Sequence, residues 1–235
     1  MNNSQSLAED LVLRRERLQS VMQRENLEAC ILTGSINIFY LTGVIYAGYL
    51  YIPATGKPVH LVKRPVGLSL ADTVSVQKPE QIPDILKGLG FPLPSTVLLE
   101  TDVLSWNNCL RLLNALGLSE AGNASALLRS LRKVKTSYEI GMTRQNALQH
   151  AKIYKAIPYL YRVGMTDIEL QIEIEHWMRQ HGSLGIFRTF GENMDIHMGI
   201  LLAGENAGIP SPFDYALGGQ GISPGLPLGA NGSPI

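Results

Sequence analysis

The sequence is divided by the stretch Leu128-Arg-Ser-Leu-Arg132-Lys-Val-Lys135-Thr136-Ser-Tyr-Glu139. Thr136 and Glu139 have the spacing of a capping box, in which each side chain accepts a hydrogen bond from a free backbone N–H group at a helix start. This spacing predicts a helix over residues 137–156. We therefore expect two domains, residues 1–130 and residues 131–235.

The second part continues with another helix start and then with loop-forming sequence. Thr166 and Glu169 repeat the capping-box spacing and predict a second helix that runs to about Gln180. Residues 187–190 and 199–202 are expected to form short strands. From Gly204 onward Gly and Pro are dense, which fits either a disordered tail or tight loops with unusual backbone angles. We favour the loops, and interpret them as shaping a site.

Helices and strands alternate in the first part. Apolar residues at helical spacing predict a helix over residues 7–25, and the apolar run at residues 29–33 predicts a buried strand. Residues 46–52 and 59–62 flank a segment rich in Pro and Gly and predict a β-hairpin. Further strands are expected at residues 74–76 and 96–99, and helices at residues 79–89 and 105–116. This alternation predicts the α/β class with a mainly buried sheet.

Composition and charge exclude several kinds of partner. Twenty Lys and Arg residues balance 20 Asp and Glu residues, so we expect neither nucleic acid nor a membrane as a partner. The N-terminus lacks the pattern of a signal peptide, and no run approaches 18 apolar residues. Cys30 and Cys109 lie among apolar neighbours, as expected for buried free thiols. These features together predict a cytoplasmic location.

Several motifs occur in an order that resembles a known family. The first part carries Arg14-x-x-Arg17-Leu18, the predicted strand at residues 29–33 and Asn37-Ile-Phe-Tyr40-Leu41-Thr42-Gly43. The second part carries Leu131-Arg132-x-x-Lys135, Glu139-Ile140, Gly164-x-Thr166-x-x-Glu169 and Gly204-x-Asn206-x-x-x-Pro210. The first part resembles the creatinase/prolidase N-terminal domain. The second resembles the start of the pita-bread metallopeptidase domain of Xaa-Pro aminopeptidases and prolidases. The resemblance implies an N-terminal creatinase-type mixed sheet with flanking helices, followed by an incomplete pita-bread α+β domain.

The resemblance also implies a two-metal hydrolase that acts on peptides with proline in second position. In such enzymes two Asp, one His and two Glu residues hold two divalent ions, which activate a bridging water. Carboxylate-rich sites of this kind suit Mn²⁺. The family's first metal-binding Asp residues lie downstream of the loop at residues 204–210, on strands that this sequence does not contain. No catalytic residue or metal ligand is therefore assigned here, and no metal ion is expected in this chain.

Three residues are candidates for the substrate pocket: His197, Asn206 and Ser211. Asn206 belongs to the loop that resembles the family's loop ahead of the metal site. Relatives of prolidase type carry His directly after the proline of this loop, where this chain has Ser211. A serine donates one hydrogen bond but cannot carry the charge of an imidazolium. Either another residue takes that role, or the substrate differs, or catalysis is absent. His197 is the nearest substitute in the sequence, with a purely structural histidine as the alternative.

Two functions remain open at this stage. The first is the N-terminal portion of a proline-specific metallopeptidase, which forms a homodimer and is inactive without its missing ligands. The second is a non-catalytic pita-bread-family module for binding or dimerisation. A binding module is expected to end at a completed layer, whereas this sequence ends in loops partway through the second domain. A half-built sheet exposes apolar faces and unpaired edges, so we favour the first function.

Overall fold

The computed structural model describes residues 6–68, 70–186, 199–211 and 218–235. The chain divides into two compact units, Met1–Gly141 (unit 1) and Met142–Ile235 (unit 2). Helix α6 (Ser137–Leu160) begins in unit 1 and continues into unit 2. The domain boundary at residue 130 stays a prediction.

Unit 1 is built on a six-stranded mixed sheet with the order β4-β3-β2-β1-β5-β6. The central strand β1 pairs antiparallel with β2 and parallel with β5. The strands are β1 (Ala29–Leu32), β2 (Ala47–Pro53), β3 (Val59–Arg64), β4 (Thr73–Ser75), β5 (Val97–Leu99) and β6 (Gly122–Asn123). The predicted α/β class with a mixed sheet and flanking helices is confirmed.

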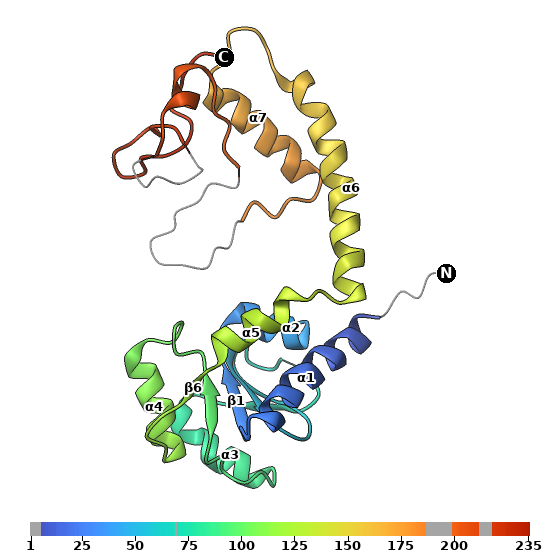
Figure 1. The fold of residues 1–235 in the computed structure, drawn as a ribbon, viewed down its shortest axis with the longest axis vertical. Coiled ribbons are helices and arrows are strands. Elements are labelled where there is room, and N and C mark those ends of the chain that lie inside the picture. The colour runs from blue at the N-terminus through green and yellow to red at the C-terminus, as the bar shows by residue number, and fades with distance from the viewer. Residues whose placement is uncertain (1–5, 69, 187–198, 212–217) are drawn as a thin grey trace. The chain divides into compact units, whose positions relative to one another are not determined.

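Helices cover both faces of this sheet (Figure 1). One face packs against α1 (Leu7–Arg24), α2 (Ser35–Thr42) and α5 (Ala124–Lys133), and the other against α3 (Ile82–Gly88) and α4 (Trp106–Leu116). A 3₁₀ turn, η1 (Pro79–Gln81), leads into α3. Successive side chains of a strand point to opposite faces, so Cys30 and Leu32 of β1 join the first core and Ala29 and Ile31 the second. The sheet is therefore buried on both faces, as the apolar strands predict.

The two cysteines are buried free thiols, as predicted. Cys30 of β1 lies in the core between the sheet and α1, α2 and α5, whereas Cys109 belongs to α4 and lies in the core on the other face. The sheet therefore separates the two thiols. Burial raises the pKa of the Cys30 thiol well above its usual range, which keeps it protonated and unreactive.

Both predicted capping boxes are present. The Thr136 hydroxyl accepts a hydrogen bond from the Glu139 N–H at 3.2 Å, and the Glu139 carboxylate accepts one from the Thr136 N–H at 2.8 Å. Thr166 and Glu169 make the same pair of contacts at 3.3 and 2.8 Å at the start of α7 (Asp167–Gln180). The two helices of the second part therefore begin where the sequence predicts.

Unit 2 consists of α6, α7 and loops in its described ranges. The strand predicted at residues 199–202 is wrong, because these residues have no strand beside them in the described ranges. The N–H of Leu201 instead donates to the side-chain oxygen of Gln171 at 3.4 Å. The other predicted strand, at residues 187–190, lies outside the described residues.

The described part of the stretch rich in Gly and Pro forms tight loops, as predicted. A short 3₁₀ turn, η2 (Gly204–Gly208), is followed by an isolated β-bridge between Pro210 and Gly218. Gly219 has a φ of 86°, and a Cβ atom there would lie 2.3 Å from the carbonyl oxygen of Gly229. Only glycine permits both this backbone angle and this close approach.

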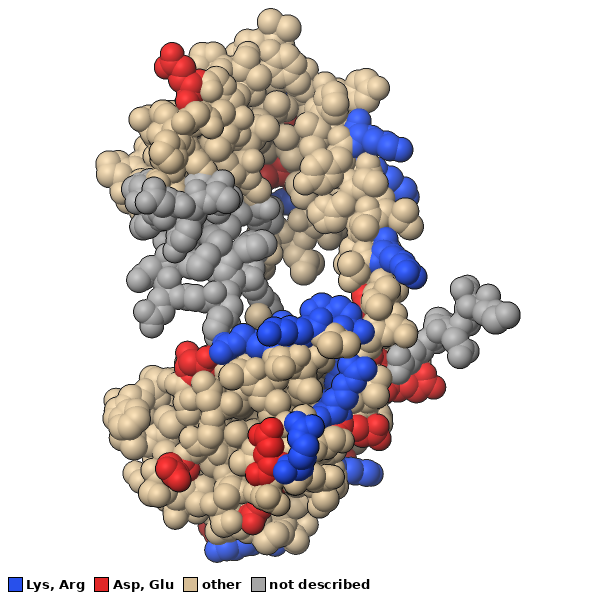
Figure 2. All heavy atoms as spheres, viewed as in Figure 1, with Lys and Arg blue, Asp and Glu red and all other residues tan. Residues whose placement is uncertain are grey.

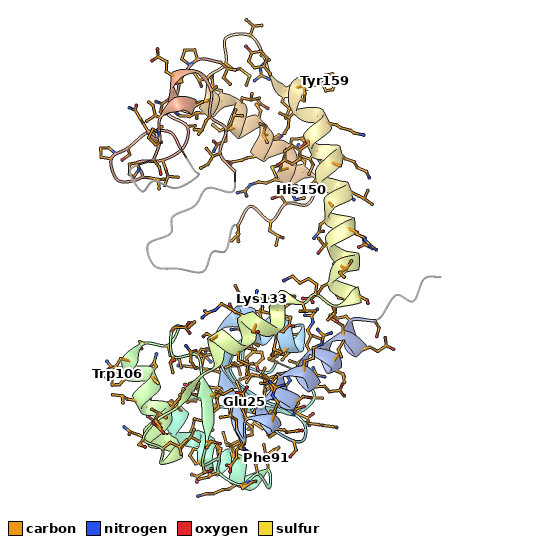
Figure 3. The ribbon with its side chains drawn as sticks, viewed as in Figure 1. Glu25, Phe91, Trp106, Lys133, His150 and Tyr159 are labelled. Atoms are coloured by element: carbon orange, nitrogen blue, oxygen red, sulfur yellow. The ribbon has the colours of Figure 1, made fainter. Side chains whose placement is uncertain are left out.

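Most residues of α6 are exposed. Figure 3 shows their side chains along the helix. All of α6 is described, and within it only Ile153 is buried; Tyr159 is 87% exposed and His150 is exposed as well. Neither α6 nor any other helix in the described ranges is both long and apolar enough to cross a membrane. On the face shown in Figure 2, basic and acidic side chains are interspersed over unit 1, in keeping with the balanced charge of the sequence.

Candidate functional site

Two of the three predicted pocket residues lie in the described loops of unit 2. Asn206 sits in η2 and is 1% exposed, and Ser211 is 3% exposed. His197 lies outside the described residues. The structure therefore shows the surroundings of Asn206 and Ser211.

Asn206 is held by a hydrogen-bond network centred on Asp167, the first residue of α7. Its side-chain NH₂ donates to the Asp167 carboxylate at 3.4 Å and to the Gly229 carbonyl at 3.0 Å. Its side-chain oxygen accepts from the N–H of Gln220 at 2.8 Å. Both amide hydrogens and the oxygen are thus engaged within the protein. In this arrangement Asn206 fastens three separate loop segments together.

Asp167 is the fully buried acceptor at the centre of this network. Its carboxylate also accepts from the N–H groups of Gly232 at 2.8 Å, Ile168 at 2.8 Å and Asn231 at 3.3 Å. A negative charge at the first turn of a helix is stabilised by the helix dipole and the free N–H groups there. Asp167 is not among the residues predicted from the sequence, although an acidic residue directly after the capping Thr166 is a visible signal.

Ser211 follows Pro210, which pairs with Gly218 in the isolated bridge. Its hydroxyl is buried and has no hydrogen-bond partner among the described residues. Because an unpaired buried hydroxyl costs free energy, this oxygen is available to a polar group that the described ranges do not contain.

The described residues do not fit a two-metal centre. No three His, Cys, Asp or Glu side chains come close enough together, within the part of the chain that the structure describes, to hold a metal ion. Two carboxylates of α7 near Asn206 are already occupied: Asp167 accepts four hydrogen bonds, and Glu169 caps the helix. No catalytic step through a metal is therefore derived from these residues.

Arg14, Arg17 and Tyr40, which belong to the motifs of the first part of the sequence, lie close together in unit 1 near the start of α6. The buried Arg14 pairs with Asp10, donates to the Tyr40 carbonyl at 2.9 Å and lies 4.6 Å from the centre of the Tyr40 ring. It also lies 3.8 Å from the Glu139 carboxylate, and Arg17 donates to the Val134 carbonyl at 3.3 Å. Burial, and next the charge of Glu139, raises the pKa of Tyr40. These motifs hold the segment that leads into α6 against α1 and α2.

A second polar cluster lies where the parallel strands β1 and β5 end. The fully buried Glu100 follows β5, and its carboxylate accepts from the N–H groups of Thr33 at 2.6 Å and Gly34 at 2.7 Å. It also accepts from the side-chain NH₂ of Asn37 at 2.7 Å. Gly34 leaves room for this carboxylate, because a Cβ atom there would lie 2.6 Å from it. Glu100 thus anchors the first turn of α2 to the sheet.

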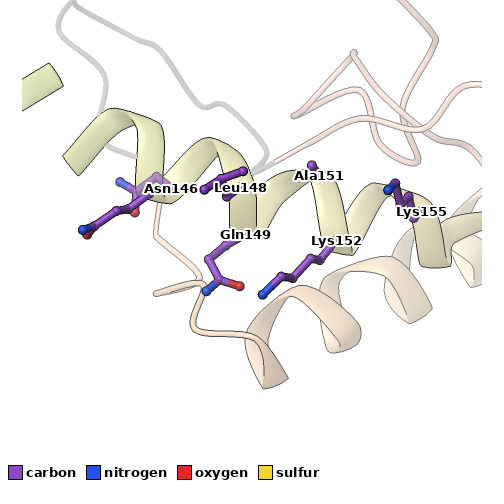
Figure 4. Close-up of a pocket in the computed structure, with 7 residues that line it drawn as sticks. Asn146, Leu148, Gln149, Ala151, Lys152 and Lys155 are labelled. Carbon is purple, nitrogen blue, oxygen red and sulfur yellow. The ribbon is translucent and has the colours of Figure 1, made fainter. Parts of the chain in front are cut away.

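Several hollows occur in the described part of unit 2, among them one of about 480 Å³ lined by residues 162–165 and the first turns of α7. A second runs along α6 and measures about 650 Å³, and all seven residues that line it come from this helix, among them Leu148, Lys152 and Lys155 (Figure 4). It is therefore a groove along one helix surface. A third is a smaller, mainly apolar cavity of about 190 Å³ between α6 and α7, lined in part by Ile153, Ile157 and Ile174.

The fold and motifs define a creatinase-type α/β domain followed by a helical segment with loops. Residues 14–134 match the family model of the Creatinase/Prolidase N-terminal domain. This match covers more than half of the 235 residues, and the chain belongs to this family. No curated protein matches the sequence.

Solved structures share the fold. The chain is 22% identical to an Xaa-Pro dipeptidase from Bacillus anthracis, with a TM-score of 0.61, and the match covers 74% of this chain and 50% of that one. The chain is 19% identical to an X-Pro aminopeptidase from Thermotoga maritima, with a TM-score of 0.58, and the match covers 73% of this chain and 50% of that one. It is 18% identical to the prolidase from Pyrococcus furiosus, with a TM-score of 0.56, and the match covers 72% of this chain and 53% of that one. The chain therefore spans about half the length of these relatives.

Proposed function

We propose that this chain forms the N-terminal portion of a metallopeptidase that hydrolyses the Xaa-Pro bond. The observation that carries the proposal is the order of its parts. The family domain over residues 14–134 is followed by a capped helix pair and loops. The fold shared with solved Xaa-Pro peptidases covers 74% and 73% of the chain, which is more than this domain alone. Proline-containing peptides are the substrate class that these relatives suggest.

In this proposal the residues of the chain shape and support a site rather than bind the metal. Asn206 and Asp167 fix the loops beside α7, and the buried Ser211 hydroxyl donates a hydrogen bond to the peptide or to a residue that the described ranges do not contain. His197 stays a candidate for the pocket. A pair of divalent ions, expected to be Mn²⁺, would activate the attacking water in the complete enzyme. A homodimer and a cytoplasmic location remain predictions.

The intact mass and metal content of the native polypeptide test this proposal. The protein is captured from its source cells with an antibody against unit 1, and its mass and bound metals are measured. We expect a mass well above the 25.7 kDa of this chain and two divalent ions per polypeptide. A mass near 25.7 kDa without bound metal would contradict the proposal and favour a non-catalytic binding or dimerisation module.

A further inference from the structure

The sequence contains one Asn-Gly pair, Asn231-Gly232, in the loop that contacts the start of α7. Glycine has no Cβ atom, so the backbone nitrogen after the asparagine is unhindered. This nitrogen can attack the side-chain carbonyl carbon of the asparagine and displace its amide. The pair is therefore a candidate site of covalent modification, and the reaction does not depend on peptidase activity.

Both reacting groups of the pair are engaged in hydrogen bonds. The N–H of Gly232 donates to the buried Asp167 carboxylate at 2.8 Å. The side-chain oxygen of Asn231 accepts from the N–H of Ser233 at 3.1 Å and from its hydroxyl at 2.7 Å. The nitrogen attacks only after it has lost its proton, and a carboxylate beside it disfavours this loss because two negative charges would then adjoin. Asp167 thus suppresses the reaction of the closed loop.

Further contacts hold the loop on both sides of the pair. The N–H of Asn231 donates to the second oxygen of Asp167 at 3.3 Å. The N–H of Asp167 donates to the Ser233 carbonyl at 2.9 Å, and the N–H of Ile235 donates to the Met165 carbonyl at 3.1 Å. Attack requires the asparagine side chain and the following peptide unit to rotate toward each other. These contacts must therefore open before the pair reacts.

We propose that Asn231 is a deamidation site that the Asp167 carboxylate keeps closed, and that its conversion releases this loop from α7. In the opened loop the Gly232 nitrogen loses its proton and bonds to Cγ of Asn231. The Cγ–Nδ2 bond breaks, and the side-chain amide leaves as ammonia with that proton. Water then opens the five-membered imide and gives aspartate or isoaspartate. Water is the only co-reactant.

Neither product fits the Asp167 carboxylate as the asparagine does. In the unmodified loop two successive N–H groups reach the two oxygens of Asp167. Isoaspartate adds one main-chain carbon between these N–H groups and changes their spacing. Aspartate adds a negative charge at a residue that already contacts the buried carboxylate. Both products therefore weaken the contacts between the loop and α7.

The deamidation rate of the 235-residue chain, measured beside a synthetic peptide of residues 226–235, tests the protection. Both are incubated in mildly alkaline buffer, and aspartate and isoaspartate at position 231 are quantified by fragment mass spectrometry. We expect the chain to react at least about tenfold more slowly than the peptide, because only the opened loop reacts. Equal rates in the chain and the peptide would overturn the proposal.

Asp167→Asn tests whether the carboxylate protects the pair. It keeps the size of the side chain but places an NH₂ group among N–H donors, and should raise the rate at least severalfold. The control Glu205→Gln makes the same change at an exposed carboxylate of η2 and should leave the rate unchanged. If Asp167→Asn loses helix content, Asn206→Ala replaces it and should also raise the rate, because Asp167 loses one donor. An unchanged rate in these variants, or equal acceleration in the control, would contradict the role of Asp167.

Hydrogen exchange of the converted chain tests the release of the loop. The chain with aspartate or isoaspartate at position 231 is separated from the unmodified chain by ion exchange. We expect faster exchange at the amides of Gly229 and Ile235, whose hydrogen bonds hold the loop. The amide of Leu98 in β5 of unit 1 is the control and should be unchanged. Unchanged exchange at Gly229 and Ile235 would show that conversion does not release the loop.

Discussion

Glu100 shows how a single buried charge is made stable. It is fully buried, yet it accepts hydrogen bonds from two backbone N–H groups and from the side chains of Thr33 and Asn37. Hydrogen bonds to a charged group are roughly twice as strong as neutral ones. The carboxylate therefore serves as the acceptor that the start of α2 requires.

Replacing this carboxylate should destabilise unit 1. In Glu100→Gln one oxygen becomes an NH₂ group that faces other donors, and we expect a loss of about 2 kcal/mol or more in the free energy of unfolding. Urea unfolding measures it. The control Glu120→Gln changes an exposed residue and should stay within about 0.5 kcal/mol. Equal stability of the two variants would show that the Glu100 hydrogen bonds do not matter for folding.

His60 should make the stability of unit 1 depend on pH. Burial, and next the charge of Arg15, lowers its pKa, and its Nδ1 lies 3.1 Å from the Tyr46 hydroxyl. With the folded pKa below the unfolded value of about 6.5, the unfolded state binds more protons between the two values. This contribution to stability is thus fully present above about pH 6.5 and is lost as the pH falls through the lowered pKa.

The variant His60→Gln should remove this part of the pH dependence. We expect the urea midpoint to fall less between about pH 7.5 and about pH 5.5, a range that spans the unfolded pKa of about 6.5, than in the original chain. His150→Gln, at an exposed position of α6, is the control. An unchanged slope in His60→Gln would rule out His60 as the cause.

At the scale of elements, Asn206 connects the loops of unit 2 to α7. In Asn206→Ala the Gln220 N–H loses its partner, and the Gly229 carbonyl keeps only the N–H of Gly221, at a cost of about 1 kcal/mol for each hydrogen bond that is lost. We expect faster hydrogen exchange at the amides of Gln220 and Gly232. The exposed Asn146→Ala on α6 should leave both rates unchanged. Unchanged exchange in Asn206→Ala would mean that the network does not hold the loops, and would favour a direct role of Asn206 in substrate binding.

The helix starts and the hairpin could be predicted because their signals are local. A capping box is complete within four residues, and the hairpin needs only two apolar runs around a turn. By contrast, α2 occupies an apolar and aromatic segment whose pattern does not separate a buried helix from a strand. Gly43, with a φ of 75°, ends this helix.

Long-range contacts explain what the sequence could not predict. The apolar run at residues 199–202 fits a strand, but strand formation requires a neighbour, and the Leu201 N–H binds a side chain of α7 instead. The same holds for Asp167: its acidity at a helix start is visible in the sequence, whereas its bonds to Asn231 and Gly232 depend on loops more than 60 residues away. Such partners follow only from the fold.

At the scale of the whole molecule, unit 1 should fold by itself when it includes the start of α6. A fragment of residues 1–130 lacks the end of α5 and the contacts of Arg14 with Glu139 and of Arg17 with Val134. We therefore expect the fragment 1–141 to melt at a higher temperature than 1–130. Limited proteolysis of the 235-residue chain should also give a resistant piece that ends near residue 141. Equal melting temperatures would show that these contacts add nothing to the domain.

The Xaa-Pro peptidase activity of the native protein tests the central claim most directly. The polypeptide captured from its source cells is supplied with Mn²⁺ and offered the dipeptides Ala-Pro and Ala-Ala and the tripeptide Ala-Pro-Ala. Our account predicts cleavage of at least one Xaa-Pro substrate, no cleavage of Ala-Ala, and loss of activity after chelation of the metal. A captured polypeptide that leaves both Xaa-Pro substrates intact in the presence of Mn²⁺ would contradict it.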